Sequence, residues 1–268
     1  MIIRNQVIYT KFTEIKDAKA TVIITHGIAE SSEEYEKLAN DLQLASYQTL
    51  LYDVRGHGRS MGKRGDIKSF HQFLDDLHEI VKKVRMTSRK KVYLLGHSMG
   101  GIITNAYVVK YKDVDGVIIS AAPTDYLPSV KTLRKVPYRL LNFKKIKTNF
   151  KGKGLSRIPY QEKYYPYHLD YIKPRLIGNI LISSIKYLHK NLENYQVPVL
   201  FLHGKADPIV PYQLTETFYN KVMSEDKDVK YYNDSLHNLF NDLDAKIITS
   251  DVISWLDQRS KVEVNEKA

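Results

Sequence analysis

The 268-residue chain contains no cysteine, a single tryptophan and no apolar run of the roughly 18 residues that a membrane-spanning helix requires. The missing cysteines exclude disulfides, a thiolate nucleophile and cysteine-ligated metal sites. The first residues, MIIRNQVIYTKF, lack the apolar stretch and the small-residue cleavage site of a signal peptide. We therefore expect a cytoplasmic protein, and a hydrophobic content of 43% is sufficient for one large folded domain.

Acidic residues are scarce in one internal segment. Residues 125–190 contain 15 Lys and Arg but only 3 Asp and Glu, a net charge of +12. The chain's 41 basic and 30 acidic residues leave 26 and 27 outside this segment, a net charge of −1. The whole basic excess therefore lies in one stretch, which indicates a separate module with its own partner preference.

Strand and helix patterns alternate on both sides of that segment. Short apolar runs that predict buried strands lie at residues 20–27, 47–53, 91–96, 114–120, 197–204 and 229–233. Helical periodicity predicts helices over residues 31–46, 70–87, 101–111, 212–223 and 243–258. The first of these helices opens with Ser31 and Glu34 at capping-box spacing. The alternation predicts an α/β fold with a mostly parallel sheet flanked by helices, in which a core of residues 1–124 and 191–268 carries residues 125–190 as an insertion.

One strand-to-helix junction has the pattern G-x-S-x-G, at Gly96-His97-Ser98-Met99-Gly100. In a nucleophile elbow the serine occupies a strained, sharp turn, and the glycines allow the helix to approach the strand closely. The alternative is a glycine-rich packing turn with an idle serine. The strand before and the helix after Ser98 favour the nucleophile.

A nucleophilic serine needs a histidine base and a carboxylate that orients it. In folds with a nucleophile elbow the chain order is serine, acid, histidine. Asp207 follows the predicted strand at 197–204, and His237 follows the predicted strand at 229–233. Asp234 is the rival carboxylate, but three residues before the histidine it would more naturally cap the loop. We therefore predict a triad of Ser98, Asp207 and His237.

The negative charge that develops during acyl transfer needs two backbone N–H donors. The residue after the nucleophile, Met99, should supply one of them. The loop after an early strand should supply the other, and HGIAE at residues 26–30 makes Ile28 the candidate, with Gly27 allowing the loop to close.

The remaining glycines and histidines do not predict a cofactor or a metal. The stretch YDVRGHGRS, residues 52–60, has Gly56 and Gly58, but Met61 stands where a dinucleotide-binding loop needs its third glycine. We expect a structural loop there. His26, His57, His97 and His203 lie on four different loops and show no metal-ligand spacing, so we expect hydrogen-bonded structural histidines.

Taken together, HGIAE, YDVRGHGRS, GHSMGG, HGKADPIV and DSLHNLF make the chain resemble the α/β-hydrolases, specifically their monoacylglycerol lipase and lysophospholipase branch. The resemblance extends in order along nearly the whole chain except the insertion. It implies a serine ester hydrolase that uses Ser98, Asp207 and His237, with Ile28 and Met99 as amide donors and without a cofactor. It also implies that residues 125–190 form a cap over an acyl pocket.

The substrate that this resemblance implies is a small lipid ester, a monoacylglycerol or a lysophospholipid. We expect the cap residues Tyr164, Tyr165, Tyr167, Leu176, Ile177 and Ile180 to line an acyl channel. A basic, tyrosine-rich cap also predicts peripheral contact with anionic membranes, whereas no nucleic-acid-binding motif accompanies the charge. Two alternatives stay open: an aminopeptidase of the same fold, and a non-catalytic protein that binds a lipid or signal molecule in the pocket.

Overall fold

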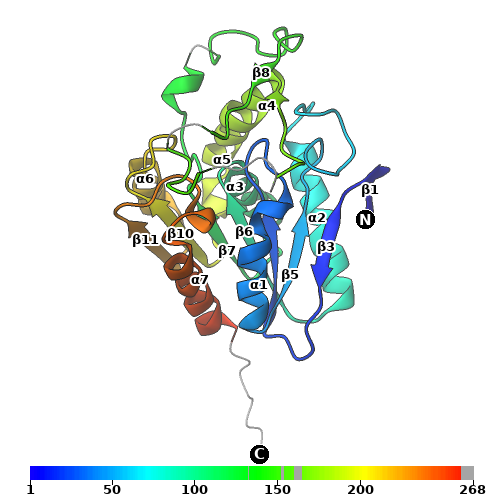
Figure 1. Ribbon diagram of the computed structural model, residues 1–268, viewed down its shortest axis with the longest axis vertical. Helices are drawn as coiled ribbons and strands as arrows, with labels where there is room; N and C mark the ends of the chain where they lie inside the picture. Colours follow the sequence, from blue (N-terminus) through cyan, green and yellow to red (C-terminus); the bar gives the residue numbers. More distant parts are fainter. Residues whose placement is uncertain (132, 152–153, 160–164, 261–268) are drawn as a thin grey trace, which may run out of the picture.

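The computed structural model describes residues 1–131, 133–151, 154–159 and 165–260. Its centre is a seven-stranded sheet in the order β11-β10-β7-β6-β4-β5-β3 (Figure 1). Neighbouring strands are parallel except β3, which runs antiparallel to β5 at one edge. The strands are β3 (Thr10–Thr13), β4 (Ala20–Thr25), β5 (Tyr47–Tyr52), β6 (Lys91–His97), β7 (Gly116–Ser120), β10 (Val199–Gly204) and β11 (Lys227–Tyr232). This arrangement confirms the predicted mostly parallel α/β architecture.

The central strands are buried on both faces, which explains their continuous apolar sequence. Every residue of β4, β5, β7 and β10 is buried, as is usual where helices cover both sides of a parallel sheet. The edge strand β11 instead alternates between intermediate and exposed residues along most of its length. A continuous apolar run therefore indicates a central strand, whereas a mixed polar and apolar sequence indicates an edge strand.

Helices cover the two faces of the sheet and form two apolar cores. On one face lie α1 (Glu36–Leu44) and α7 (Ala245–Arg259), which also contact each other (Figure 1). On the other face lie α2 (His71–Thr87), α3 (Met99–Tyr111) and α6 (Gln213–Lys221). The ends of α2, α3, α6 and α7 fall within two residues of their predicted positions.

The predicted capping box at the first helix is wrong. Residues Ser32–Tyr35 form a 3₁₀ turn, η1, and α1 begins only at Glu36. The Ser31 hydroxyl makes no capping bond, and it has no hydrogen-bond partner in the part of the chain that the structure describes. The Glu34 carboxylate is buried and lies 3.2 Å from Nε2 of His168. Glu34 is therefore engaged by a residue far away in sequence instead of by Ser31.

Between β7 and β10 the chain leaves the sheet and passes over its carboxyl edge, at the top of Figure 1. This inserted segment, residues 125–190, contains η2 (Pro128–Val130) and the short antiparallel pair β8 (Ile146–Lys147) and β9 (Tyr171–Ile172). It ends in a helical stretch made of α4 (Pro174–Gly178), the π-helical η4 (Asn179–Ser184) and α5 (Ile185–Lys190). No helix was predicted there, although buried Leu176, Ile180 and Ser184 recur every four residues and η4 and α5 pack on α3.

Short elements complete the fold. They are the hairpin β1 (Ile2–Ile3) and β2 (Gln6–Val7) and the 3₁₀ turns η5 (Leu192–Asn194) and η6 (Leu239–Asn241). Among the described residues, no helix has the length and apolar character needed to cross a bilayer.

Candidate active site

Ser98 lies at a strained turn between β6 and α3. Its backbone has φ 51° and ψ −115°, a conformation that few non-glycine residues adopt. A Cβ atom at Gly100 would fall against the carbonyl oxygen of Thr25 on β4, so only glycine allows the helix to approach this closely. The turn has the geometry expected of a nucleophile elbow, and it leaves 9% of Ser98 exposed to solvent.

A chain of hydrogen bonds links Ser98 to the two residues predicted to act with it. Nε2 of His237 lies 3.0 Å from Oγ of Ser98, and Nδ1 of His237 lies 2.7 Å from Oδ2 of Asp207. The loops that follow β6, β10 and β11 supply the three side chains, as the sequence analysis predicted. Both distances are within the range that proton transfer to and from a catalytic base requires.

The Asp207 carboxylate is held in its ionised form. Its Oδ1 accepts hydrogen bonds from the amides of Ile209 and Val210, at 2.8 and 3.0 Å. Burial alone would raise the pKa of Asp207, but His237, the nearby His203 and the Val210 amide hold that pKa well below its usual range. An ionised Asp207 favours the histidine tautomer that carries its proton on Nδ1. The rival Asp234 is exposed and makes no hydrogen bond to any described residue.

One predicted amide donor directly follows Ser98, and the other lies in the loop after β4, the strand that pairs with β6. Met99 is the first residue of α3, directly after Ser98, and Ile28 lies in the loop after β4. Neither backbone N–H has a hydrogen-bond partner in the described ranges. Their role as oxyanion donors stays a prediction.

Glu30 braces the loop that carries Ile28. Its Oε2 accepts a hydrogen bond from the Gly27 amide at 2.7 Å and another from the Tyr35 hydroxyl at 2.8 Å. Burial, together with the nearby Glu34, raises the pKa of Glu30 to about 8. The inserted segment contacts the same loop, because the Leu169 amide donates to the Ala29 carbonyl at 2.8 Å. Glu30 was not predicted as a site residue, although it is the last residue of the motif HGIAE that predicted the Ile28 loop.

Each of the four histidines expected to be structural, His26, His57, His97 and His203, makes at least one hydrogen bond. His26 accepts the amide of Val54 at Nε2, and His203 contacts Thr215 and the Val210 carbonyl. Burial lowers the pKa of His26 to about 4, and that of His57 to about 3. No group of side chains suited to holding a metal ion is found among the residues that the structure describes.

The loop at residues 52–60 follows β5 at the carboxyl edge of the sheet and is held by Asp53. Asp53 accepts hydrogen bonds from the backbone and hydroxyl of Ser32, at 2.8 and 2.6 Å, and from the Arg59 amide at 2.7 Å. It thereby ties this loop to the chain that follows the Ile28 loop. A structural function for these glycines and charges is consistent with the sequence analysis.

The residues predicted to line an acyl channel have several different environments. Tyr164 lies outside the described residues. The Tyr165 ring stacks on His168 with centroids 5.0 Å apart, and Tyr167 lies over the Arg59 guanidinium. Leu176 and Ile180 are fully buried, and Ile177 packs partly buried beside them. The acyl channel stays a prediction.

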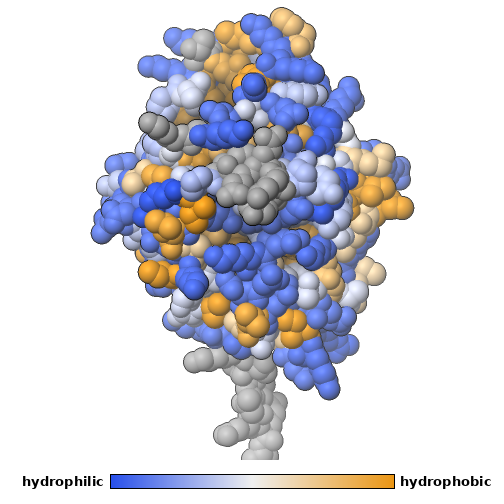
Figure 2. All heavy atoms as spheres, in the orientation of Figure 1, coloured by the Kyte–Doolittle hydropathy of each residue, from blue (hydrophilic) through white to orange (hydrophobic). Residues whose placement is uncertain are grey.

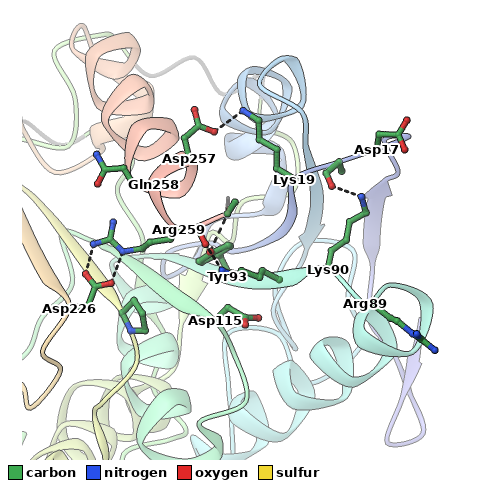
Figure 3. Close-up of a pocket in the computed structure, with 14 residues that line it drawn as sticks. Asp17, Lys19, Arg89, Lys90, Tyr93, Asp115, Asp226, Asp257, Gln258 and Arg259 are labelled. Carbon is green, nitrogen blue, oxygen red and sulfur yellow. Dashed lines mark hydrogen bonds and ion pairs between the residues drawn. The ribbon is translucent and has the colours of Figure 1, made fainter. Parts of the chain in front are cut away.

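A broad depression of about 1490 Å³ lies at the opposite, amino edge of the sheet (Figure 3). Two ion pairs lie within it: Lys19 contacts Asp257 at 2.7 Å, and Arg259 binds Asp226. The triad lies at the other end of the strands. This depression is therefore separate from the site around Ser98.

The chain is similar to proteins of known class over almost its full length. The family described as serine aminopeptidase, S33, matches residues 16–244. A monoacylglycerol lipase from Mycolicibacterium smegmatis is 27% identical, over 94% of this chain and 92% of its own length. The monoglyceride lipase of Homo sapiens is 26% identical, over 90% of this chain and 84% of its own. The phospholipase YtpA of Bacillus subtilis is 24% identical, over 89% and 95%.

Solved structures give the same picture of the fold. The crystal structure of a monoacylglycerol lipase from Paleococcus ferrophilus superposes with a TM-score of 0.83 and 26% identity, covering 94% of this chain and 99% of that one. A soluble variant of the Saccharomyces cerevisiae monoglyceride lipase, solved in complex with a substrate analog, also gives a TM-score of 0.83, at 22% identity and with 97% and 94% coverage.

Proposed function

Because this chain belongs to the serine aminopeptidase S33 family, within the monoacylglycerol lipase branch of the α/β-hydrolases, we propose that Ser98, His237 and Asp207 hydrolyse lipid esters through an acyl-enzyme. The chain is a carboxylic ester hydrolase, the class that its lipase relatives share. The proposed substrates carry one acyl chain on a polar head group, as in a monoacylglycerol or a lysophospholipid.

The proposed mechanism assigns one task to each group. Oγ of Ser98 attacks the ester carbonyl carbon while Nε2 of His237 accepts the serine proton, and Asp207 stabilises the imidazolium that forms. The amides of Met99 and Ile28 donate to the oxyanion. His237 then protonates the departing alcohol, and a water molecule, activated by the same histidine, releases the fatty acid and restores Ser98.

The observation that carries this proposal is the continuous hydrogen-bonded chain from Ser98 through His237 to Asp207, at 3.0 and 2.7 Å. An idle serine in a packing turn would not need a buried histidine on one side and an ionised buried carboxylate behind it. The strained backbone of Ser98 supports the same assignment.

Two measurements test the proposal. A fluorophosphonate probe should label the protein at Ser98, and the Ser98→Ala variant should not be labelled. Hydrolysis rates across p-nitrophenyl esters of increasing chain length, with a monoacylglycerol and a lysophospholipid alongside, should define the acyl preference. A wild-type protein that neither reacts with the probe nor hydrolyses any of these esters would instead support a non-catalytic binding protein.

The family description favours one competing activity, the removal of N-terminal residues from peptides. Such an enzyme needs a carboxylate to hold the substrate amine. In the inserted segment the described acids are Asp125 and Asp170, and Glu162 lies outside the described residues. This scarcity favours esters. Hydrolysis of amino-acid p-nitroanilides at rates comparable to the esters would reverse that preference.

Residues 125–190 act as a cap over the reacting ester in this proposal. The segment crosses the carboxyl edge of the sheet, and its apolar residues Leu176 and Ile180 face the core beside α3. It also contacts the loop of Ile28 through Leu169. The core of residues 1–124 and 191–268 then supplies the chemistry, and the cap selects what reaches it.

The outer face of the cap is suited to an anionic membrane surface. Leu140 and Phe143 have 73% and 77% of their surface exposed, and Lys144, Lys145 and Lys147 are exposed beside them. In Figure 2, hydrophobic and hydrophilic side chains alternate at the top of the molecule, over this segment. Apolar side chains can insert among acyl chains while lysines near the surface contribute about 1 kcal/mol each with anionic lipids.

Co-sedimentation with vesicles tests this contact. Binding should be stronger to vesicles that contain an anionic phospholipid than to purely zwitterionic ones. It should weaken as salt is raised, because the Debye length falls to about 3 Å at 1 M. Equal binding to both vesicle types, or binding to neither, would reduce the charge to a solubility feature.

A further inference from the structure

Four residues of the inserted segment, Gly154–Arg157, lie against both of the loops that supply Asp207 and His237. The carbonyl of Gly154 accepts the amide of His237 itself, at 3.3 Å. The carbonyl of Leu155 accepts the next amide, that of Asn238, at 2.7 Å. The inserted segment is therefore bonded to the backbone of the residue proposed as the base.

Gly154 also packs on the loop of the proposed acid. It has a φ of +103°, and a Cβ atom there would collide with the ring of Pro208, the residue directly after Asp207. Glycine at this position thus satisfies two requirements, a left-handed backbone and close approach to Pro208. One short stretch contacts the acid loop with its Cα and the base loop with its carbonyl group.

Arg157 binds two carboxylates at the C-terminal end of the base loop, and one of them also binds the start of that loop. Its amide and its Nε donate to Oδ1 and Oδ2 of Asp242, at 3.1 and 3.2 Å. Its terminal nitrogen donates to Oδ2 of Asp244 at 2.6 Å, and the same oxygen accepts the Ser235 hydroxyl at 2.5 Å. Ser235 lies two residues before His237 and Asp242 lies five after it. A second tie reaches the same loop, because the Ser156 hydroxyl donates to the Asn241 carbonyl at 3.0 Å.

The base loop needs such external support. From residue 233 to residue 244 it lies outside the sheet, and its regular structure consists of the three-residue η6. Asp242 is 3% exposed, so its carboxylate is costly to bury unless it is paired, and Arg157 supplies the pairing charge. Without Arg157 the carboxylate would favour conformations of the loop that expose it to water.

We infer that Arg157 and Gly154 are positioning residues that hold the His237 loop so that the imidazole stays within hydrogen-bond reach of both Ser98 and Asp207. The inference rests on the proposed function and extends it, because the cap then controls turnover as well as access. A misplacement of about 1 Å at a reacting group can cost on the order of a hundredfold in rate.

The test compares Arg157→Ala with a matched control, Arg175→Ala. Arg175 is also an arginine of the inserted segment, and it pairs with a core carboxylate, donating to Oδ1 and Oδ2 of Asp66 at 2.9 and 2.5 Å. It makes no contact with the base loop. Loss of Arg175 removes the ion pair with Asp66, and loss of Arg157 removes the ion pairs with Asp242 and Asp244, so both variants should lose thermal stability.

Only Arg157→Ala should change the chemistry. We expect kcat for a soluble short-chain p-nitrophenyl ester to fall about tenfold to a hundredfold, with KM changed less than twofold, and the fluorophosphonate inactivation rate to fall in parallel. Arg157→Lys should recover part of kcat, since it keeps a charge for Asp242 but lacks the second nitrogen with which the guanidinium bridges Asp242 and Asp244. Arg175→Ala should keep kcat within twofold.

A spectroscopic measurement separates positioning from a purely structural effect. In folded Arg157→Ala, the proton on Nδ1 of His237 should exchange faster with solvent, and its low-field proton resonance should broaden. Gly154→Ala should act in the same direction. If its folding fails, Arg157→Ala and Arg157→Lys carry the test alone.

Three results would overturn the inference. They are a folded Arg157→Ala variant with kcat within twofold of wild type, an equal loss of kcat in Arg175→Ala, and an unchanged histidine resonance. In each case wild-type protein that is still labelled at Ser98 leaves the proposed function intact. Failure of wild type to be labelled would instead reject the proposed function.

Discussion

The sheet core and the inserted segment differ in where their polar side chains lie: those of the proposed triad are buried and paired, whereas most basic side chains of the segment are exposed. In the core, Ser98, His237 and Asp207 are 9%, 4% and 7% exposed, and His237 is hydrogen-bonded to both of the others. In the segment, basic residues give a net charge of +12, and apolar side chains such as Phe143 are 77% exposed. Buried polar groups must be paired, whereas exposed ones stay free for an external partner. In the proposed function, the core therefore supplies the chemistry and the inserted segment the contact with a lipid surface.

The two regions meet through paired groups. Leu169 donates to the Ala29 carbonyl, Arg175 pairs with Asp66, and Arg157 pairs with Asp242. At each of these contacts the polar groups of the inserted segment are hydrogen-bonded or ion-paired, as polar groups in the core are. Variants that affect only one of the two regions test this division of tasks, and the variant with the largest expected loss of activity comes first.

Removing the nucleophile should abolish the chemistry of the core and leave the surface of the cap unchanged. Ser98→Ala should lower ester hydrolysis by a factor of about 1000 or more, because triad residues act as a unit. Thermal unfolding should be nearly unchanged, since the serine hydroxyl contributes little to the apolar core. Vesicle binding by this variant is the matched control and should equal that of wild type. More than a few per cent residual activity in a clean preparation would reject Ser98 as the nucleophile.

Two aspartates, one buried and one exposed, sharpen the comparison within the core. Asp207→Asn should lower kcat on the order of a thousandfold while the protein stays folded, because the amide favours the wrong tautomer of His237. Asp234→Asn should leave kcat unchanged, since Asp234 is exposed. Steady-state kinetics of the two variants gives the answer, and a reversal of the two effects would assign the acid role to Asp234.

Charge reversal of the cap should have the opposite result, a loss of surface binding without a loss of chemistry. Replacing Lys144, Lys145, Lys147 and Lys151 with glutamate should weaken binding to anionic vesicles tenfold or more, at about 1 kcal/mol per lysine near the surface. Lys153, in the same basic stretch of the sequence, lies outside the described residues. Hydrolysis of a soluble short-chain ester should stay within twofold of wild type.

The control for charge reversal uses lysines of the core. Four exposed core lysines replaced with glutamate, Lys16, Lys37, Lys221 and Lys246, change the net charge equally. If this variant loses as much vesicle binding as the cap variant, total charge and not the cap drives the contact.

The smallest effect concerns the buried Glu30, whose pKa is raised to about 8. A carboxyl group with a raised folded pKa stabilises the protein below its unfolded pKa, and that contribution is lost as pH rises through the folded pKa. The melting temperature should therefore fall by a few degrees between pH 7 and pH 9, at up to about 1.4 kcal/mol per pH unit and released proton.

Other titrating groups near Glu30 also affect how the melting temperature depends on pH, and a Glu30 variant separates its contribution from theirs. Glu34, whose pKa burial also raises to about 8, contributes in the same direction. Burial lowers the pKa of His168, so its own effect falls below about pH 6.5, outside the measured window. Glu30→Gln keeps an acceptor for the Gly27 amide and should flatten the dependence. A slope equal to that of wild type would show that other groups cause it.

The sequence by itself determined the central strands and the order of the proposed triad. Continuous apolar runs such as that of β10 report burial on both faces, which depends on residue type alone. The glycines around Ser98 encode a local backbone turn, so the pattern G-x-S-x-G is sufficient to locate it. Because parallel strands end at one edge of the sheet, chain order then placed Asp207 and His237 beside Ser98.

Only the tertiary structure decided which distant side chains pair. The capping box at Ser31 failed because Glu34 is drawn to His168, more than 130 residues away in the chain. The contacts of Arg157 with Asp242 and Asp244, and of Glu30 with Tyr35, have no periodic or local signal of their own. Periodicity records how deeply a residue is buried and how its neighbours along the chain fold. Which partner it meets there depends on where the loops between elements converge, and the packing of the whole chain sets that position.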